Sequence, residues 1–327
     1  NGYPEVAEAT RQRVLEAARR HNYLPNARAK GLATGRAMAI GHVIPVSHRH
    51  EIVNPVFSDF ILGAGEAYQR EGYDMLLSLV ADDEQSRVYH EIAAKGAVDG
   101  IILHAPRVGD PRIAILKEIG LPFVVHGRAS DHDEDYSWVD VNNRRAFHRA
   151  TDFLLDLGHA RIGLVNGLEA MDFAARRRKG YEGALAQRGL RLDPALIRSD
   201  EMTEMHGYES TRDLLRLKDP PTAILAASMI VAIGVRRAVE ETGLILGRDL
   251  SVVTHDDELS YLRNGGEVPI FTAVRSSVRR AGQLCGQMLI DLISAPDRAP
   301  RHTLLEAELT VGQSTGPVPA AALAAKG

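Results

Sequence analysis

Short apolar runs alternate with amphipathic stretches along almost the whole chain from residue 38 onward, and this alternation constrains the fold more than any other feature. The apolar runs are expected to form strands and the amphipathic stretches to form helices. Such an alternation is typical of βαβ units, which build parallel sheets covered by helices on both faces. Strands are expected at residues 39–44, 73–79, 100–104, 122–126, 161–166, 222–227, 250–255 and 271–274. Helices are expected at residues 55–70, 84–95, 111–118, 144–157, 174–188, 204–217, 231–242 and 278–294.

These units can close into one barrel or divide into two open sheets. The polar and acidic segment 127–137 is typical of a connection, and a second strand–helix series of similar length follows it. We therefore expect an α/β fold with two doubly wound parallel-sheet subdomains. In open parallel sheets a ligand binds beyond the carboxyl ends of the strands, so two facing sheets predict a ligand cleft between them.

Composition and cysteine usage exclude several classes of protein. The 327 residues are 45% hydrophobic and 25% charged, which is the balance of a globular protein of two domains. No apolar run reaches the ~18 residues that a membrane span needs, so no membrane partner is expected. The single cysteine, Cys285, excludes an intrachain disulfide and fits a reducing cytoplasm. The first residues lack the pattern of a secretory signal, although a mature exported protein would lack it too.

The first 36 residues differ in charge from the rest of the chain. They carry seven Lys or Arg and three acidic residues, a net charge of +4, whereas the other 291 residues carry a net charge of −8. Residues 9–21 are expected to form a helix with Val14, Leu15 and Ala18 on an apolar stripe. A basic arm on an acidic body fits a polyanionic partner, and a solvated helix with a basic face is the alternative.

Sequence signatures of cofactor and metal chemistry are missing. There is no phosphate-binding loop of the G-x-x-x-x-G-K-[ST] type and no G-x-S-x-G nucleophile elbow. Residues 63–65 place two glycines inside an expected helix, which does not fit a dinucleotide fingerprint. The histidines show no metal-ligand spacing on an expected helix face, so surface or capping roles are favoured over zinc. We expect no cofactor and no catalytic residue.

Several short motifs occur along the body of the chain. They are residues 54–57 (NPVF), 98–102 (VDGII), 157–162 (LGHARI) and 252–257 (VVTHDD), together with Arg177, Gly180 and Tyr181. In this order and spacing they resemble the motifs of the LacI/GalR family of bacterial transcription regulators. Residues 1–6, 10–14 and 22–26 resemble the end of the family's DNA-binding headpiece, and residues 29–33 resemble its hinge helix.

The resemblance implies a DNA-binding homodimer built from three parts. These are residues 1–36 (the remnant of the headpiece, with the hinge), residues 37–140 with 270–296 (the first effector subdomain), and residues 141–269 with 297–327 (the second). The hinge residues implied to contact DNA are Asn26, Ala29 and Leu32, with Leu32 wedged into a base step or, alternatively, packed on its own subdomain. Compared with the family, the chain is expected to begin after the helix-turn-helix helices and to bind DNA weakly as written. Ala7 stands where a capping Ser or Thr is usual.

The resemblance also implies a carbohydrate effector in the cleft. Arg177 and Asp256 are the main candidates, because guanidinium and carboxylate groups offer paired hydrogen bonds to vicinal hydroxyls. Helix N-capping is the alternative for Asp256, and core packing is the alternative for Phe57. Met229 stands where many members have an acid, so the effector cannot be copied from other members. The complete set of candidate effector-binding residues is Phe57, Arg128, Asp172, Phe173, Arg177, Met202, Ser228 and Asp256.

Together these features predict a cytoplasmic, sugar-responsive transcriptional regulator, and repression is the type of regulation that we expect. Residues 126–128 (HGR) and 138–140 (WVD) resemble regulators of α-glucoside use. One alternative is the solute-binding protein of a sugar importer, which shares the two-lobed architecture but lacks an Arg-rich arm. A sugar-processing enzyme is less favoured, because glycoside hydrolysis normally needs two placed carboxylates.

Overall fold

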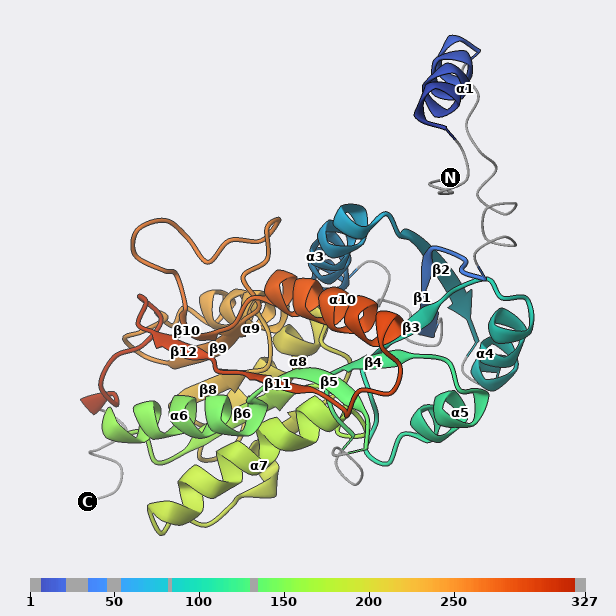
Figure 1. Cartoon of the computed structure of the whole chain (residues 1–327). Coiled ribbons are helices and arrows are strands. Elements are labelled where there is room, and N and C mark those ends of the chain that lie inside the picture. The colour runs from blue at the N-terminus through green and yellow to red at the C-terminus, as the bar shows by residue number, and fades with distance from the viewer. Residues whose placement is uncertain (1–6, 22–34, 46–53, 82–83, 130–134, 321–327) are drawn as a thin grey trace.

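The computed structural model describes residues 7–21, 35–45, 54–81, 84–129 and 135–320, and these form two sheets with helices on both faces (Figure 1). The first sheet has six parallel strands in the order β2-β1-β3-β4-β5-β11. Its strands are β1 (Ala39–Pro45), β2 (Asp74–Val80), β3 (Gly100–His104), β4 (Phe123–His126), β5 (Ser137–Val141) and β11 (His302–Leu305). The expected division into two parallel-sheet subdomains is confirmed.

The second sheet has the order β7-β6-β8-β9-β10-β12, and its last strand runs antiparallel to its neighbour. Its strands are β6 (Ile162–Asn166), β7 (Ile197–Ser199), β8 (Ala223–Ala226), β9 (Ser251–Asp256), β10 (Thr272–Arg275) and β12 (Glu308–Thr310). The central strands are buried along their whole length, because helices cover both faces of the sheet. This explains why the middle of each of these strands is apolar in the sequence, with polar residues confined to the ends.

Four helix pairs cover the two sheets. On the first sheet, α3 (Pro55–Glu71) packs with α10 (Val278–Ser294) on one face, and α4 (Gln85–Ala94) packs with α5 (Pro111–Ile119) on the other. On the second sheet, the pairs are α6 (Asn143–Asp156) with α7 (Asp172–Gln187), and α8 (Glu204–Leu215) with α9 (Met229–Glu241). Residues 194–196 form a short 3-10 helix (Pro194–Leu196) before β7.

The chain crosses between the two subdomains three times: after β5, between β10 and α10, and between β11 and β12. The expected boundaries at residues 270 and 297 are therefore wrong. Strand β10 belongs to the second sheet, and β11 belongs to the first. Strand β11 has only four residues and alternates between exposed and half-buried positions, so the sequence offers no continuous apolar run there. Segment 127–137 is also not the connection between subdomains, because β5 follows it in the first sheet.

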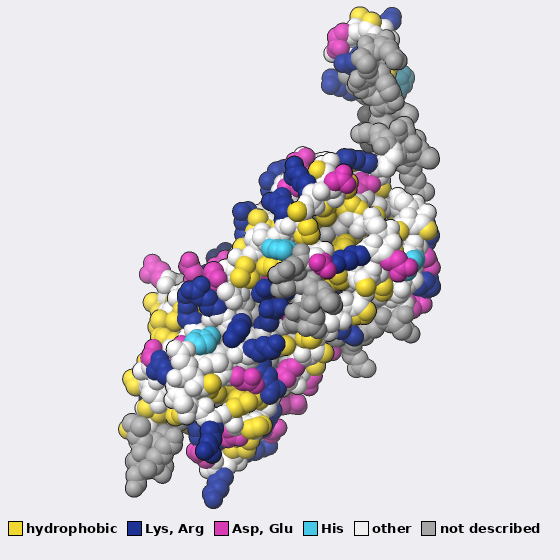
Figure 2. Space-filling model, turned by 60° about the horizontal axis from the view of Figure 1, so that its bottom comes forward, with side chains coloured by type: hydrophobic (Ala, Val, Ile, Leu, Met, Phe, Trp, Pro, Cys, Tyr) yellow, Lys and Arg dark blue, Asp and Glu magenta, His cyan; other side chains and the backbone are white. Residues whose placement is uncertain are grey.

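Helix α1 (Glu8–Arg20) lies apart from both sheets (Figure 1), which leaves Val14 62% exposed on the stripe expected to be apolar. Ala7 precedes this helix and makes no side-chain capping bond, as expected from its sequence. Figure 2 shows basic and acidic side chains side by side, both on this helix and over the visible face of the subdomains. The hinge candidates Asn26, Ala29 and Leu32 lie outside the described residues.

No helix in the described part of the chain combines the length and the apolar character that crossing a bilayer requires. Within the same residues, no group of three or more His, Cys, Asp or Glu side chains is placed to hold a metal ion.

We expect replacement by alanine to have opposite effects on stability at two glycines of α3. A Cβ on Gly63 would lie 2.0 Å from the carbonyl oxygen of Arg279 on α10, so α3 and α10 touch backbone to backbone there. A Cβ on Gly65 would have no neighbour within 4 Å. We expect Gly63→Ala to destabilise the fold by about 2 kcal/mol or more through overpacking, and Gly65→Ala to stabilise it by about 0.5–1 kcal/mol through helix propensity. Urea denaturation measures both, and equal effects of the two variants would contradict the close approach of the helices.

Candidate functional site

A cleft of about 560 Å³ lies between the carboxyl ends of the strands of the two sheets. The first subdomain contributes residues at the ends of β3, β4 and β5, and the second contributes the segments that follow β6, β7, β9 and β10. This is where ligands bind in open parallel sheets, and the volume suits a small organic molecule.

Loops from the two subdomains meet beside the cleft. The backbone N–H of Asp172 donates to the carbonyl of Pro106 at 3.0 Å, and Val108 N–H donates to Ala170 at 3.0 Å. At a second place, in the segment that follows β9, Ser260 N–H donates to the carboxylate of Asp59 on α3 at 2.8 Å. These hydrogen bonds join the subdomains at positions other than the chain crossings.

Aromatic rings form apolar parts of the cleft wall. Phe57 lies edge-on to His104, with ring centroids 5.3 Å apart, and Phe60 stacks on His126 at 4.2 Å. Phe173 comes from the opposite subdomain and lies against the guanidinium of Arg177 at 5.0 Å. The cleft therefore presents aromatic rings from both sides.

Arg177 is held in a fixed orientation at the cleft. Its Nε donates to Asn143 Oδ1 at 2.8 Å and its Nη1 donates to the carbonyl of Ala227 at 2.6 Å. The guanidinium also lies 5.1 Å from the ring centroid of Phe147. Burial lowers the pKa of Arg177 to about 10, against the attraction of Asp257 and Asp140. Arg177 is therefore charged at neutral pH and offers a preoriented cation.

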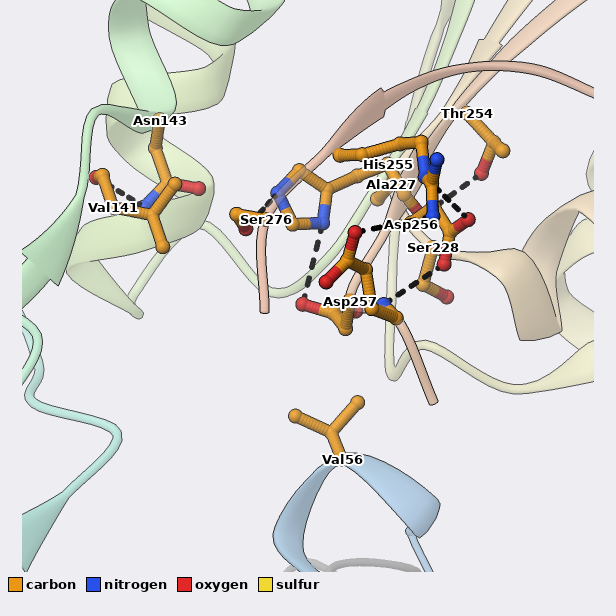
Figure 3. A network of polar contacts seen from close by, with 12 residues as sticks. Val56, Val141, Asn143, Ala227, Ser228, Thr254, His255, Asp256, Asp257 and Ser276 are labelled. Atoms are coloured by element: carbon orange, nitrogen blue, oxygen red, sulfur yellow. Dashed lines mark hydrogen bonds and ion pairs between the residues drawn. The ribbon is translucent and has the colours of Figure 1, made fainter. Parts of the chain in front are cut away.

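A His255–Asp257 pair lies at the end of β9 (Figure 3), and the carboxylate of Asp257 attracts the guanidinium of Arg177 electrostatically. His255 Nδ1 lies 3.3 Å from Asp257 Oδ1, and Ser276 Oγ lies 3.3 Å from His255 Nε2. Burial alone would raise the pKa of Asp257, but His255, Arg177 and His126 together hold it below its ordinary value. Asp257 thus supplies an ionised carboxylate to the cleft.

Arg128 and Asp140 form a second charged pair at the cleft. Arg128 Nε donates to Asp140 Oδ2 at 2.8 Å, and the guanidinium lies 4.7 Å from the ring centroid of Trp138. Burial raises the pKa of Asp140, against the opposing effect of Arg128. Both residues line the cleft, so the pair adds a donor and an acceptor on the first subdomain.

The structure brings five of the eight candidate effector residues to the cleft and places three elsewhere. Asp172 is buried at the start of α7, where it pairs with Arg176. Ser228 caps α9 by accepting from Val231 N–H at 3.3 Å. Asp256 accepts from Glu258 N–H at 2.9 Å. The five residues in the cleft wall are Phe57, Arg128, Phe173, Arg177 and Met202.

Several polar residues of the cleft were missed by the sequence analysis. They sit at or just beyond the carboxyl ends of strands, so strand position was the available signal. Asp257 was missed because β9 ends at Asp256, and alternate residues of an extended segment face opposite sides. Its side chain faces the cleft with that of His255, whereas Asp256 lies outside the cleft wall. The missed polar residues nearest these strand ends are His104, His126, Asp140, Asn143, His255, Asp257 and Ser276.

Comparison with known proteins gives the same two-lobed architecture. Residues 151–315 match a family model described as a periplasmic binding protein-like domain. The HTH-type transcriptional regulator AglR of Rhizobium meliloti is 42% identical over 320 residues, which is 98% of this chain and 89% of the relative. The HTH-type transcriptional regulator CelR of Thermobifida fusca is 29% identical over 96% of this chain and 92% of the relative.

Solved structures of regulators are also similar. The structure of a transcriptional regulator CelR–cellobiose complex has a TM-score of 0.76 and 27% sequence identity, covering 96% of this chain and 93% of that chain. A LacI family transcriptional regulator from Enterococcus faecium, solved with bound ribose, has a TM-score of 0.71 and 25% identity, covering 85% of this chain and 99% of that one.

Proposed function

The chain belongs to the LacI family of helix-turn-helix transcriptional regulators, and from this premise we propose that it is a repressor whose affinity for operator DNA is set by a saccharide in the cleft. The observation that carries the proposal is the chemistry of the cleft wall. Aromatic rings suit the C–H face of a sugar, and the fixed guanidinium of Arg177 opposite the carboxylate of Asp257 suits its hydroxyls.

Within saccharides, we favour an α-glucoside as the effector. Residues 126–128 and 138–140 carry the motifs that resemble regulators of α-glucoside use, and His126, Gly127, Arg128 and Asp140 all line the cleft. The similar regulator CelR has been solved with cellobiose, a disaccharide, which supports a cleft large enough for two sugar rings.

The proposed mechanism is a two-state equilibrium of a homodimer in the cytoplasm. The three chain crossings allow the subdomains to change their relative orientation, and the hydrogen bonds between the loops at residues 106–108 and 170–172 belong to one of the two arrangements. A bound sugar touches both subdomains and so favours one arrangement. Operator affinity then changes by the ratio of the sugar's affinities for the two states.

Two measurements test this proposal together. Thermal denaturation and calorimetry with maltose, trehalose, sucrose, cellobiose and ribose test binding, because a ligand at 100 times its Kd stabilises the folded state by about 2.7 kcal/mol. Fluorescence anisotropy with operator DNA, using the product of the complete gene, tests regulation. We expect at least one α-glucoside to bind and to change operator affinity. Binding without any change in operator affinity would contradict the mechanism, and no binding by any sugar would contradict the effector class.

Membership of this family decides against both alternatives from the sequence analysis, the solute-binding protein of an importer and the sugar-processing enzyme. An importer's solute-binding protein shares the domain architecture, but the relatives that match 96–98% of the chain are transcriptional regulators. The chain is therefore a regulator and not an enzyme.

A further inference from the structure

A chain of three buried polar side chains leads from α3 to the cleft. Tyr68 lies on α3, His42 on β1 and His104 at the end of β3, and they are 1%, 0% and 3% exposed. Tyr68 OH lies 2.9 Å from His42 Nε2, and His42 Nδ1 lies 2.8 Å from His104 Nε2. His104 lines the cleft, and its Nδ1 has no hydrogen-bond partner among the described residues. We call Tyr68, His42 and His104 the relay.

Both histidines of the relay are neutral at neutral pH. Burial lowers the pKa of His42 to about 3, and burial, helped by His42, His126 and Arg112, lowers the pKa of His104 well below its ordinary value. A neutral imidazole carries one N–H and one acceptor nitrogen. The two hydrogen bonds of the relay can therefore run in only two directions.

The hydroxyl of Tyr68 decides between these directions. If Tyr68 donates to His42 Nε2, then His42 Nδ1 donates to His104 Nε2, and the single proton of His104 is on Nδ1. If the direction is reversed, the Tyr68 proton has no acceptor among the described residues, although the side chain is buried. A buried donor without a partner costs about 1–3 kcal/mol. The first direction is therefore populated far more than the reverse direction.

We propose that Tyr68, acting through His42, fixes the tautomer of His104 so that its Nδ1–H points into the cleft as a hydrogen-bond donor. Tyr68 is thus a positioning residue that never touches the effector. His104 then selects an effector with an acceptor oxygen at this place. The selection of a sugar oxygen rests on the proposed function, whereas the tautomer itself does not.

The tautomer can be measured without any ligand. In ¹⁵N-histidine-labelled protein, long-range ¹H–¹⁵N spectra distinguish protonated from unprotonated ring nitrogens, and single His→Gln variants at positions 42 and 104 assign the signals. We expect protonated Nδ1 and unprotonated Nε2 in both His42 and His104 at pH 7. A protonated Nε2 in His104, or a doubly protonated ring, would overturn the proposal even if no variant folds.

Tyr68→Phe is the decisive variant, because it removes only the hydroxyl. Without the hydroxyl, both directions of the hydrogen bonds leave one buried nitrogen of His42 without a partner, so neither direction is favoured. The chemical shift of His104 Nδ1 should then move toward the average of the values for a protonated and an unprotonated ring nitrogen. Tyr181→Phe is the matched control, since Tyr181 is also 1% exposed and makes one hydrogen bond, to the carbonyl of Ile162 at 2.8 Å on the other subdomain. Unchanged His104 signals in Tyr68→Phe would show that Tyr68 does not set the tautomer.

Calorimetry with maltose and cellobiose as probes then tests the effect on binding. With the two tautomers about equally populated, affinity should fall by about twofold in Tyr68→Phe and stay unchanged in Tyr181→Phe. Equal affinities in wild type and Tyr68→Phe would overturn the role of His104 as donor to the sugar. If none of the five sugars tested above binds wild type, the proposed effector class fails, and the tautomer measurement still decides the relay.

Discussion

Arg177→Met is expected to abolish effector binding, with a loss of affinity of about 100-fold or more. The guanidinium has five N–H groups, and its bonds to Asn143 and Ala227 use two of them among the described residues. The remaining groups can serve hydroxyl oxygens of a ligand from a fixed position. Hydrogen bonds to a charged group contribute about 1.5–3 kcal/mol each, so the loss of two gives at least two orders of magnitude in Kd. Calorimetry with the sugar that binds wild type measures the effect.

Arg177→Lys and Arg178→Lys separate geometry from charge. Arg177→Lys keeps the charge but loses the planar arrangement of donors, so its affinity should remain far below that of wild type. Arg178 is the next residue of α7, and it pairs with Glu169 and Glu182 away from the cleft wall, so Arg178→Lys should bind like wild type. Wild-type affinity in Arg177→Met would remove the main support for the site.

Most of the central strands could be predicted because they are buried in continuous apolar stretches, and the long helices because apolar residues recur with a helical period. The interior strand β5 was not expected, because Ser137 and Asp140 interrupt its apolar residues. All five residues of β3 are buried, and the first four, residues 100–103, form an uninterrupted apolar run in the sequence. Helix α3 begins after Asn54, whose side chain accepts from Val56 N–H, and it ends at Gly72 in the left-handed conformation. Such cap residues give boundaries that agree with the structure within a residue.

Three of the four edge strands could not be predicted in the same way, whereas the fourth, β2, was expected at residues 73–79. Strands β7, β11 and β12 have three or four residues with half-exposed patterns, and each completes the edge of a sheet whose other strands lie far away in the sequence. Pairing of this kind is determined by tertiary contacts rather than by local pattern. The misplaced boundary at residue 297 follows from it, because β11 was not expected. At residue 270 the strand β10 was expected but assigned to the wrong sheet.

The candidate site was predictable to the level of strand ends, but not to the level of side-chain direction. Arg177 and Phe173 lie in the cleft wall as expected, while Asp257 rather than Asp256 lines it. The hydrogen bonds of the relay could not be predicted either. A histidine inside an apolar run indicates a buried side chain, but it does not indicate which residue is its hydrogen-bond partner. Only the structure shows His42 between Tyr68 and His104.

Acidification should weaken the fold by about 4 kcal/mol between pH 7 and pH 5. The unfolded chain protonates its histidines below a pKa of about 6.5, whereas burial holds the pKa of His42 at about 3 and, against the attraction of Asp257, that of His126 at about 4. Stability from these groups is complete above pH 6.5 and is lost as the pH falls toward 3, by about 1.4 kcal/mol per pH unit for each group. His104 acts in the same direction, because burial lowers its pKa well below its ordinary value.

Two variants separate proton linkage from packing in this acid response. His42→Gln removes a titrating ring, and its amide is able to accept from Tyr68 and donate to His104, so the loss of stability between pH 7 and pH 5 should shrink by about 2 kcal/mol. Leu185→Ala removes a buried side chain from the core of the second subdomain, in a cluster that contains no histidine, so stability should fall equally at both pH values. Urea unfolding at pH 7, 6 and 5 gives the free energies. A pH dependence of His42→Gln that matches wild type would mean that the buried ring of His42 is not the source of the acid response.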